Sequence, residues 1–187
     1  MDSNDLALRC QAGEVESFDL LFSQHKDQVY RVAIALLKQP QDAEDAVQEV
    51  FMRVHRAIDS FDPQRGQFTT WLYQITVNYC RSRLRRKRFF TMPWQQDQLE
   101  ERVPADPSIE KQVLRDEFRQ TLWDEVNTLG DKHRLVVILH YYMDLPCEHI
   151  SEILGCRVGT VYSRLHTARH RLQERLERRG VTLRGTP

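Results

Sequence analysis

The sequence has few residues that interrupt regular structure, and it has no long apolar run. Seven glycines and seven prolines in 187 residues are too few for a sandwich or barrel with many tight turns. No stretch of about 18 apolar residues occurs, so we expect no membrane-spanning helix. The four cysteines contain no C-x-x-C pair, which favours reduced thiols. The acidic N-terminus lacks a signal-peptide core, so we expect the chain to stay in the cytoplasm, with no membrane contact of its own.

Signatures of several enzyme classes are also missing. The sequence contains no Walker A loop, no G-x-S-x-G and no H-E-x-x-H. No Asp or Glu stands three residues before a histidine, so the ligand spacing of a di-iron helical bundle is lacking. We therefore expect no catalytic residues, no cofactor and no metal.

The charges balance overall but are separated along the chain. There are 27 basic and 27 acidic residues. Residues 1–60 carry a net charge of −5, residues 61–92 carry +6, residues 93–130 carry −5 and residues 131–187 carry +4. This alternation suits a chain that meets nucleic acid at two places and another partner elsewhere. Solvated helix faces are the alternative interpretation.

Apolar residues recur at three- and four-residue steps, which predicts helices with one buried face. Pro40 separates the first two series and can begin a helix but not continue one. The composition of 61–66, FDPQRG, predicts a turn, and a third long helix is expected over about 67–89. We predict no strands. The two series are Phe18, Leu21, Phe22, Val29, Val32 and Leu36, then Val47, Val50, Phe51, Val54 and Ile58.

The composition of residues 93–108 is that of a linker, with three prolines and few apolar positions. A second helical block follows from about 109 to 179. The predicted fold class is therefore all-α, with two small helical bundles joined by a flexible linker. The expected domains are 1–92 and 109–180.

Residues 147–172 have the spacing of a helix-turn-helix. Small Ser151 allows close helix approach, Gly155 suits the turn, and Val161 fills the crossing. A polar face opposite the apolar stripe of the second helix suits the DNA major groove, although a helical hairpin with a solvated basic face is the alternative. His166 and His170 have a metal-compatible spacing, but no further ligand on that turn completes a set. The face and its flank carry Tyr162, Ser163, Arg164, His166, Thr167, His170 and Arg171.

Aromatic residues precede a basic cluster in the predicted helix that begins near residue 67. The segment 81–88, RSRLRRKR, has six basic residues in eight. Aromatics beside such a cluster suit unstacked bases and phosphates. For Trp71 the core is favoured, because tryptophan is usually largely buried.

An acidic and amide patch is expected on the helix that follows Pro40. Asp42, Asp45, Gln48 and Glu49 cluster opposite its apolar stripe. Such a patch suits docking of a basic protein. Acidic residues are also favoured at the start of a solvated helix by the macrodipole, and the residues alone favour this second interpretation.

Three motifs together resemble the small extracytoplasmic-function (ECF) group of bacterial RNA polymerase sigma factors. They are DAEDAVQEVF at 42–51, FTTWLYQITVNYCRSRLRR at 68–86 and EILGCRVGTVYSRLHTAR at 152–169. They occur in the family's order and spacing, and the resemblance extends over nearly the whole chain.

The resemblance implies a promoter-specificity subunit without catalytic activity. Its partners would be core RNA polymerase (the clamp of the largest subunit and the flap of the second), promoter DNA and an anti-sigma factor. Asp45, Gln48 and Glu49 would dock on the polymerase, and the second domain would read the −35 element as duplex. The loop Ser60–Gln67 would capture a flipped base of the −10 element, and the next helix would hold the melted strand. The residues expected at the −10 element are Phe61, Asp62, Gln64, Arg65, Asn78, Arg81, Arg85 and Arg86.

Two positions depart from the family pattern. Relatives usually have a basic residue where this chain has Tyr162 and an arginine where it has Thr167. The promoter sequence of relatives therefore does not transfer, and His170 or Arg171 is a candidate for compensation.

Two alternative functions stay open. A stand-alone helix-turn-helix regulator leaves the aromatic and basic segment 68–88 unexplained. A helical enzyme or metal-binding protein would use Asp42, Asp45, Glu49 and His55, but it lacks ligand spacing.

Overall fold

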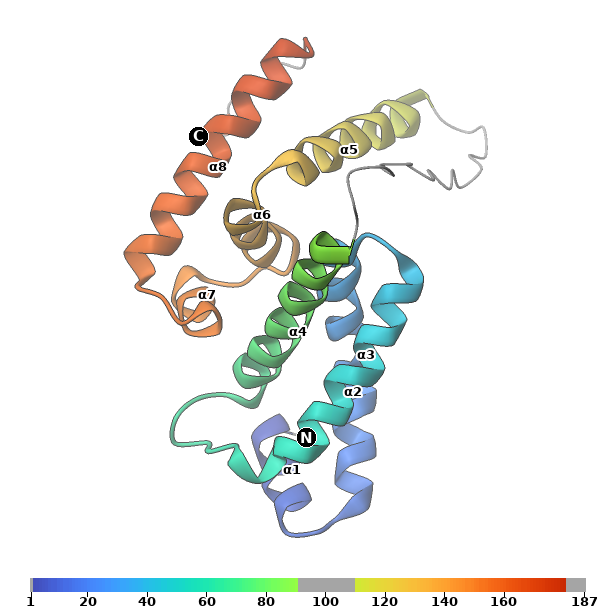
Figure 1. Ribbon diagram of the computed structural model, residues 1–187, viewed down its shortest axis with the longest axis vertical. Coiled ribbons are helices and arrows are strands. Elements are labelled where there is room, and N and C mark those ends of the chain that lie inside the picture. The colour runs from blue at the N-terminus through green and yellow to red at the C-terminus, as the bar shows by residue number, and fades with distance from the viewer. Residues whose placement is uncertain (1, 91–109, 181–187) are drawn as a thin grey trace.

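The computed structural model of the chain is all-helical (Figure 1). It describes the backbone of residues 2–90 and 110–180 and the side chains of residues 2–87 and 118–180. Within the described ranges no strand occurs, and no helix is long and apolar enough to cross a membrane. The all-α fold class is confirmed. The predicted linker at 93–108 lies outside the described residues.

The first bundle contains four α-helices and one short 3-10 turn. Helix α2 packs against all three other helices of this bundle. Pro40 is the first residue of α3, as expected for a residue that has no N–H to donate. The elements are α1 (Ser3–Gln11), α2 (Val15–Leu37), α3 (Pro40–Ala57), η1 (Ile58–Ser60) and α4 (Phe68–Phe90).

Two features of the first bundle differ from the sequence prediction. Helix α1 was not predicted, yet its Leu6 and Ala7 are fully buried and bring the N-terminal segment into the core. Phe22 was expected in the buried stripe but is 37% exposed. It follows Leu21 on the helix, so it lies at the edge of the stripe rather than at its centre.

The second bundle contains the predicted helix-turn-helix. Gly155 ends α7 with φ of 58°, the left-handed conformation that the turn requires. Val161 is fully buried beneath the turn. Val158 is apolar but 37% exposed, because it is the first residue of α8. The elements are α5 (Glu110–Thr128), α6 (Asp131–Val137), the π-helical turn η2 (Ile138–Tyr142), α7 (Cys147–Leu154) and α8 (Val158–Arg178).

The two bundles contact each other through α4 against α7, which lie side by side in Figure 1. They also meet through α2 against η2. Buried Arg134 donates a 2.7 Å hydrogen bond to the carbonyl of Leu36, in the last turn of α2. This places a cation at the negative end of the helix dipole. Arg31 also lies over the ring of Tyr142, 5.0 Å from its centroid. These contacts join residues about a hundred positions apart, which helical periodicity cannot predict.

Candidate functional site

Helix α3 presents three predicted docking residues on its outer side. The Asp45 side chain is 52% exposed, the Glu49 side chain is 45% exposed, and Gln48 is exposed. On the opposite side Val50 and Val54 are fully buried, which fixes the orientation of the helix. The outward position of these three residues agrees with the prediction.

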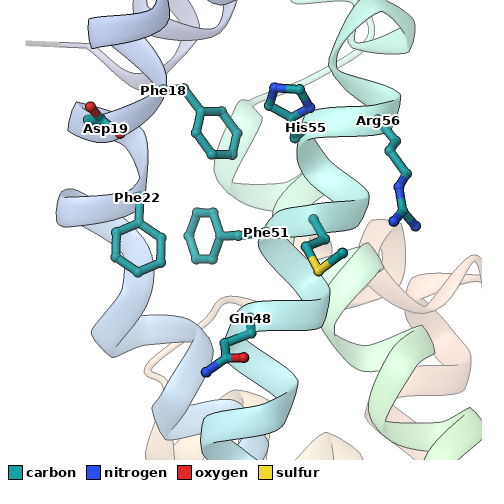
Figure 2. Close-up of a pocket in the computed structure, with 8 residues that line it drawn as sticks. Phe18, Asp19, Phe22, Gln48, Phe51, His55 and Arg56 are labelled. Atoms are coloured by element: carbon teal, nitrogen blue, oxygen red, sulfur yellow. The ribbon is translucent and has the colours of Figure 1, made fainter.

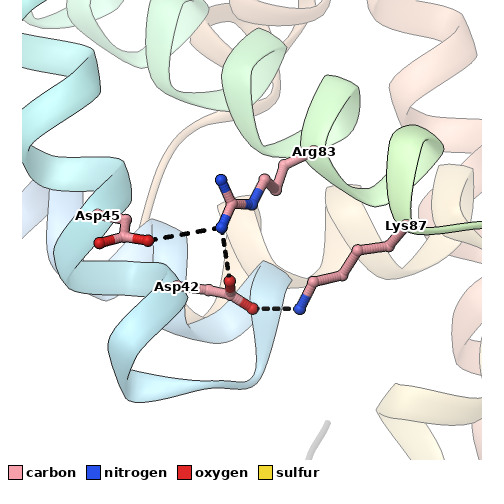
Figure 3. Close-up of polar contacts among 4 residues, drawn as sticks. All are labelled: Asp42, Asp45, Arg83 and Lys87. Carbon is pink, nitrogen blue, oxygen red and sulfur yellow. Dashed lines mark hydrogen bonds and ion pairs between the residues drawn. The ribbon is translucent and has the colours of Figure 1, made fainter. Parts of the chain in front are cut away.

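Asp42 has a different environment from the exposed patch, because it is only 9% exposed (Figure 3). One carboxylate oxygen accepts a 3.0 Å hydrogen bond from Arg83, and the other pairs closely with Lys87. Arg83 also lies 3.5 Å from Asp45. We call these four residues the α3–α4 ion cluster. The cluster joins the acidic helix to the basic helix, so Asp42 acts in packing rather than in an exposed patch.

The pKa of Asp42 connects this cluster to stability. Burial alone would raise the pKa, but hydrogen bonds from Lys87 and Arg83 outweigh it and hold the pKa below its ordinary value. A group with a lowered folded pKa stabilises the fold above its unfolded pKa of about 3.9. This contribution is lost as the pH falls through the lower folded pKa.

We expect Asp42→Asn to lower the free energy of unfolding by about 2 kcal/mol at pH 7, because it leaves the two cations without their shared carboxylate. The difference from the native chain should shrink once the pH is low enough to protonate Asp42. Urea denaturation at pH 7 and at successively lower pH measures both effects. Exposed Glu44 provides the control Glu44→Gln on the same helix. Equal losses for the two variants, or a loss for Asp42→Asn that does not change with pH, would contradict this role.

The turn between η1 and α4 is held by polar contacts to the backbone. Asp62 Oδ1 accepts a 2.9 Å hydrogen bond from the N–H of Gln64. Gln11 donates 2.8 Å hydrogen bonds to the carbonyls of Ile58 and Phe61, which ties the turn to α1. Gln64 and Arg65 are exposed at the tip, and Asp62 is half-buried. These side chains are therefore available for the predicted contact with a base.

The position of Phe61 does not fit its predicted role in binding the −10 element. Its side chain is 5% exposed and packs against Phe68 and Trp71, each with a ring-centroid distance of 5.6 Å. A side chain buried to this extent has almost no surface to offer a base. Phe61 instead anchors the start of the turn in the core.

Helix α4 divides its polar residues between two faces. Asn78, Arg81 and Arg85 follow three- and four-residue steps and are exposed, as is Arg86. Arg83 and Lys87 turn toward α3 and join the ion cluster (Figure 3). The exposed set is the one predicted to meet DNA, whereas Arg83 and Lys87 already have partners within the chain.

The aromatic residues of α4 whose side chains are described belong mainly to the core. Tyr73 is 7% exposed and Tyr79 is 6% exposed. Trp71 is half-buried against the core, in agreement with the favoured interpretation. Tyr73 and Tyr79 are therefore not platforms for unstacked bases, and among the described side chains of α4 the exposed polar ones remain for such a contact.

Helix α8 carries the seven residues predicted to read duplex DNA. Its orientation is fixed by a buried stripe that includes Val161, Leu165 and Ala168. The Tyr162 hydroxyl donates a 3.2 Å hydrogen bond to Glu148 of α7, and the Thr167 hydroxyl donates to the carbonyl of Ser163. Tyr162, Ser163, His166, His170 and Arg171 are exposed, and Arg164 and Thr167 are half-buried.

Histidine and acidic residues form no metal cluster in the part of the chain whose side chains are described. His170 lies 3.3 Å from Glu174, without a third ligand. Asp42, which belongs to the proposed metal set, instead forms ion pairs with Arg83 and Lys87. Buried His25 bonds to Ser3 and Gln28, which is the environment of a core histidine.

An apolar groove lies between α2 and α3 and was not predicted from the sequence (Figure 2). Phe22 and Phe51 pack edge to face at a centroid distance of 4.8 Å, and Phe18 contacts His55 at 5.1 Å. Met52 is 46% exposed at this site. Gln48 lines the groove, so the groove is continuous with the acidic face of α3. The sequence gives only a weak indication of this groove, namely large apolar residues next to the positions of the buried stripes of α2 and α3.

Comparisons with known proteins identify both bundles. The family model for Sigma-70 region 2 matches residues 21–90, and that for Sigma-70, region 4 matches residues 119–172. The ECF RNA polymerase sigma factor SigW of Bacillus subtilis is 33% identical over 178 residues, which cover 88% of this chain and 91% of SigW. SigE of Mycolicibacterium smegmatis, also an ECF RNA polymerase sigma factor, is 36% identical over 86% of this chain. The match spans only 62% of SigE.

Solved structures share the fold. The sigma factor RpoE of Bartonella quintana, in complex with the anti-sigma factor NepR, superposes with a TM-score of 0.64 and 25% identity. The match covers 87% of this chain and 98% of RpoE. CnrH, solved with the cytosolic domain of CnrY, gives a TM-score of 0.69 at 24% identity, covering 92% of this chain and 96% of CnrH. This second likeness concerns the fold alone.

Proposed function

The chain belongs to the ECF group of sigma factors, and we propose that it is a dissociable subunit that binds core RNA polymerase and selects promoters. The observation that carries this proposal is the presence of three separate polar faces, on α3, α4 and α8, within one chain whose regions 2 and 4 match the family in order. In this role the protein acts in the cytoplasm with polymerase and has no catalytic activity of its own. The domains would extend over 1–92 and 109–180.

The docking surface on polymerase would consist of Asp45, Gln48 and Glu49 together with the adjoining groove. Exposed carboxylates attract a basic partner, and exposed Phe22 and Met52 supply apolar contact area beside them. Because Gln48 belongs to both features, one partner can cover them together. This surface would bind the clamp of the largest polymerase subunit. The second domain of the chain would bind the flap of the second polymerase subunit.

The opened −10 element would bind along the turn and α4. Asp62, Gln64 and Arg65 would capture a flipped base, whose extrusion costs a few kcal/mol. The exposed face with Asn78, Arg81, Arg85 and Arg86 would hold the strand and its phosphates.

The −35 element would be read as duplex by α8 in the major groove. Ser163 and Thr167 lie centrally on its outward face, with His166 and His170 beside them. The same proposal includes an anti-sigma partner, supported by the RpoE relative that was solved with one. Its identity can be sought by pull-down from cells.

In vitro transcription tests the function directly. Core polymerase is incubated with a genomic template set, with and without the purified chain, and transcript starts are mapped. We expect new, defined start sites only when the chain is present. An unchanged set of starts would reject the function. Tight, specific duplex binding without polymerase would instead favour a stand-alone helix-turn-helix regulator, and a gel shift measures it.

A further inference from the structure

The side chain of Tyr162 is held by a carboxylate of the neighbouring helix. Tyr162 lies in the second turn of α8 and is 52% exposed. Its hydroxyl donates a 3.2 Å hydrogen bond to Oε1 of Glu148, which belongs to the first turn of α7 and is also exposed. The contact therefore joins the two helices of the helix-turn-helix at their surface rather than in the core.

The Glu148 carboxylate fixes the direction of this hydrogen bond. A carboxylate accepts hydrogen bonds and donates none, whereas a tyrosine hydroxyl has a single proton to donate. The charge of Glu148 raises the pKa of Tyr162, as does the hydrogen bond between them, with smaller contributions from neighbouring Cys147. The hydroxyl thus keeps its proton at pH 7 and gives it to Glu148. Toward any third group the Tyr162 oxygen is an acceptor and not a donor.

Tyr162 lies in the part of α8 that would approach base edges. In a helix-turn-helix, the N-terminal residues of the second helix contact the bases. Ser163 follows Tyr162 directly on the outward face, and His166 lies one turn farther along the same side, about 40° around the helix. Both neighbours are exposed. The free lone pair of the Tyr162 oxygen is therefore available beside the outward face.

The major groove distinguishes bases by the groups that they present. Adenine N6 and cytosine N4 are donors, whereas guanine presents the two acceptors N7 and O6. An acceptor oxygen can bond to either amino group. Opposite guanine, two acceptors would face each other, and both would lose their hydrogen bonds to water without replacement.

We infer that Tyr162, positioned by Glu148, selects adenine or cytosine and rejects guanine at one base of the −35 element. The inference rests on the proposed placement of α8 in the major groove. Tyr162 makes the contact with the base. Glu148 is a positioning residue, because it acts by taking the hydroxyl proton.

The experiment measures base preference with the complete chain bound to core polymerase. Each position of the mapped −35 element is randomised in turn, and the bound duplexes are sequenced. We expect Tyr162→Phe to change the preference at one position only. There the native chain should favour adenine or cytosine over guanine about 3- to 10-fold, as expected for a single hydrogen bond. Tyr162→Phe should lose this preference, and Tyr162→Arg, which offers only donors, should favour guanine.

Glu148→Ala tests the positioning role without changing Tyr162. The hydroxyl is then free to donate, so guanine should be bound as well as adenine or cytosine at that position. A merely structural role of Glu148 would weaken binding to all sequences equally and leave the preference intact. Glu152→Ala is the matched control, since it removes the same charge from an exposed position one turn farther along α7. This control should keep the native preference.

Four results would overturn the inference: a Tyr162→Phe profile identical to that of the native chain, a native preference for guanine at the position that Tyr162→Phe changes, an unchanged preference in Glu148→Ala, or the same change in Glu152→Ala. Each of them is distinct from failure of the proposed function. That failure would appear as an absence of polymerase-dependent promoter binding by the native chain, and the inference would then fail with it.

Discussion

Glu49→Lys is expected to lower the affinity of the chain for core RNA polymerase by about tenfold or more. The change places a positive charge in the centre of a negative docking face, and like charges across an interface cost several kcal/mol. The fold should survive, because the Glu49 side chain is 45% exposed and its ion pair with Arg53 is long, at 3.9 Å. Such surface pairs contribute little to stability. Isothermal calorimetry with purified core polymerase measures the affinity.

The matched control is Asp27→Lys, which makes the same charge change at an exposed position of α2 outside the groove. It should bind polymerase like the native chain. If Glu49→Lys binds with native affinity, or if both variants weaken binding equally, the docking role of this face is rejected. Urea denaturation of both variants checks that stability is unchanged within about 0.5 kcal/mol.

Phe68→Ala is expected to destabilise the protein by about 3 to 5 kcal/mol, the typical cost of emptying a large aromatic site. Phe68 is fully buried at the start of α4. It contacts Phe61 edge to face at 5.6 Å, Trp71 at 5.8 Å and His25 at 5.6 Å. A loss of this size is a large part of the 5 to 15 kcal/mol that is usual for a domain. Urea denaturation measures it.

Loss of Phe68 should also affect promoter opening, because Phe61 rests on its ring and begins the turn proposed to capture a base. Phe68→Leu, which keeps much of the volume, should fold and should reduce strand opening by polymerase, as measured with a single-strand-specific probe. Leu20→Ala, at a 45% exposed position on α2, is the control for both measurements. A free-energy loss for Phe68→Ala no greater than that of the control would contradict the importance of this aromatic cluster.

Much of the fold was predictable because helix patterns are local. The breaker Pro40, the left-handed Gly155 and the apolar steps of α2, α3 and α8 each act within a few residues of sequence. Helix α1 was missed, since nine residues with two fully buried apolar side chains give too short a pattern. Its stability depends on tertiary packing against the rest of the bundle, which no local signal reports.

In the candidate site, too, local periodicity predicted some features, whereas contacts between helices decided others. Exposure of Gln48, Asn78 and Ser163 was predictable, because periodicity alone sets which residues oppose a buried stripe. The environments of Asp42 and Phe61 were not, since each is decided by a partner on another element. The groove between α2 and α3 and the hydrogen bond from Tyr162 to Glu148 likewise depend on packing between helices. Long-range pairing of this kind leaves no mark in a single sequence.

The most direct test of the account is to locate two positions on promoter DNA within one complex. A photo-cross-linking side chain replaces Asn78 in one variant and Thr167 in another, and each variant is assembled with core polymerase on an open promoter. We predict that position 78 links to the opened strand of the −10 element and that position 167 links to the paired −35 element. Cross-links from both positions to the same segment, or cross-links from position 78 to paired DNA only, would contradict the account.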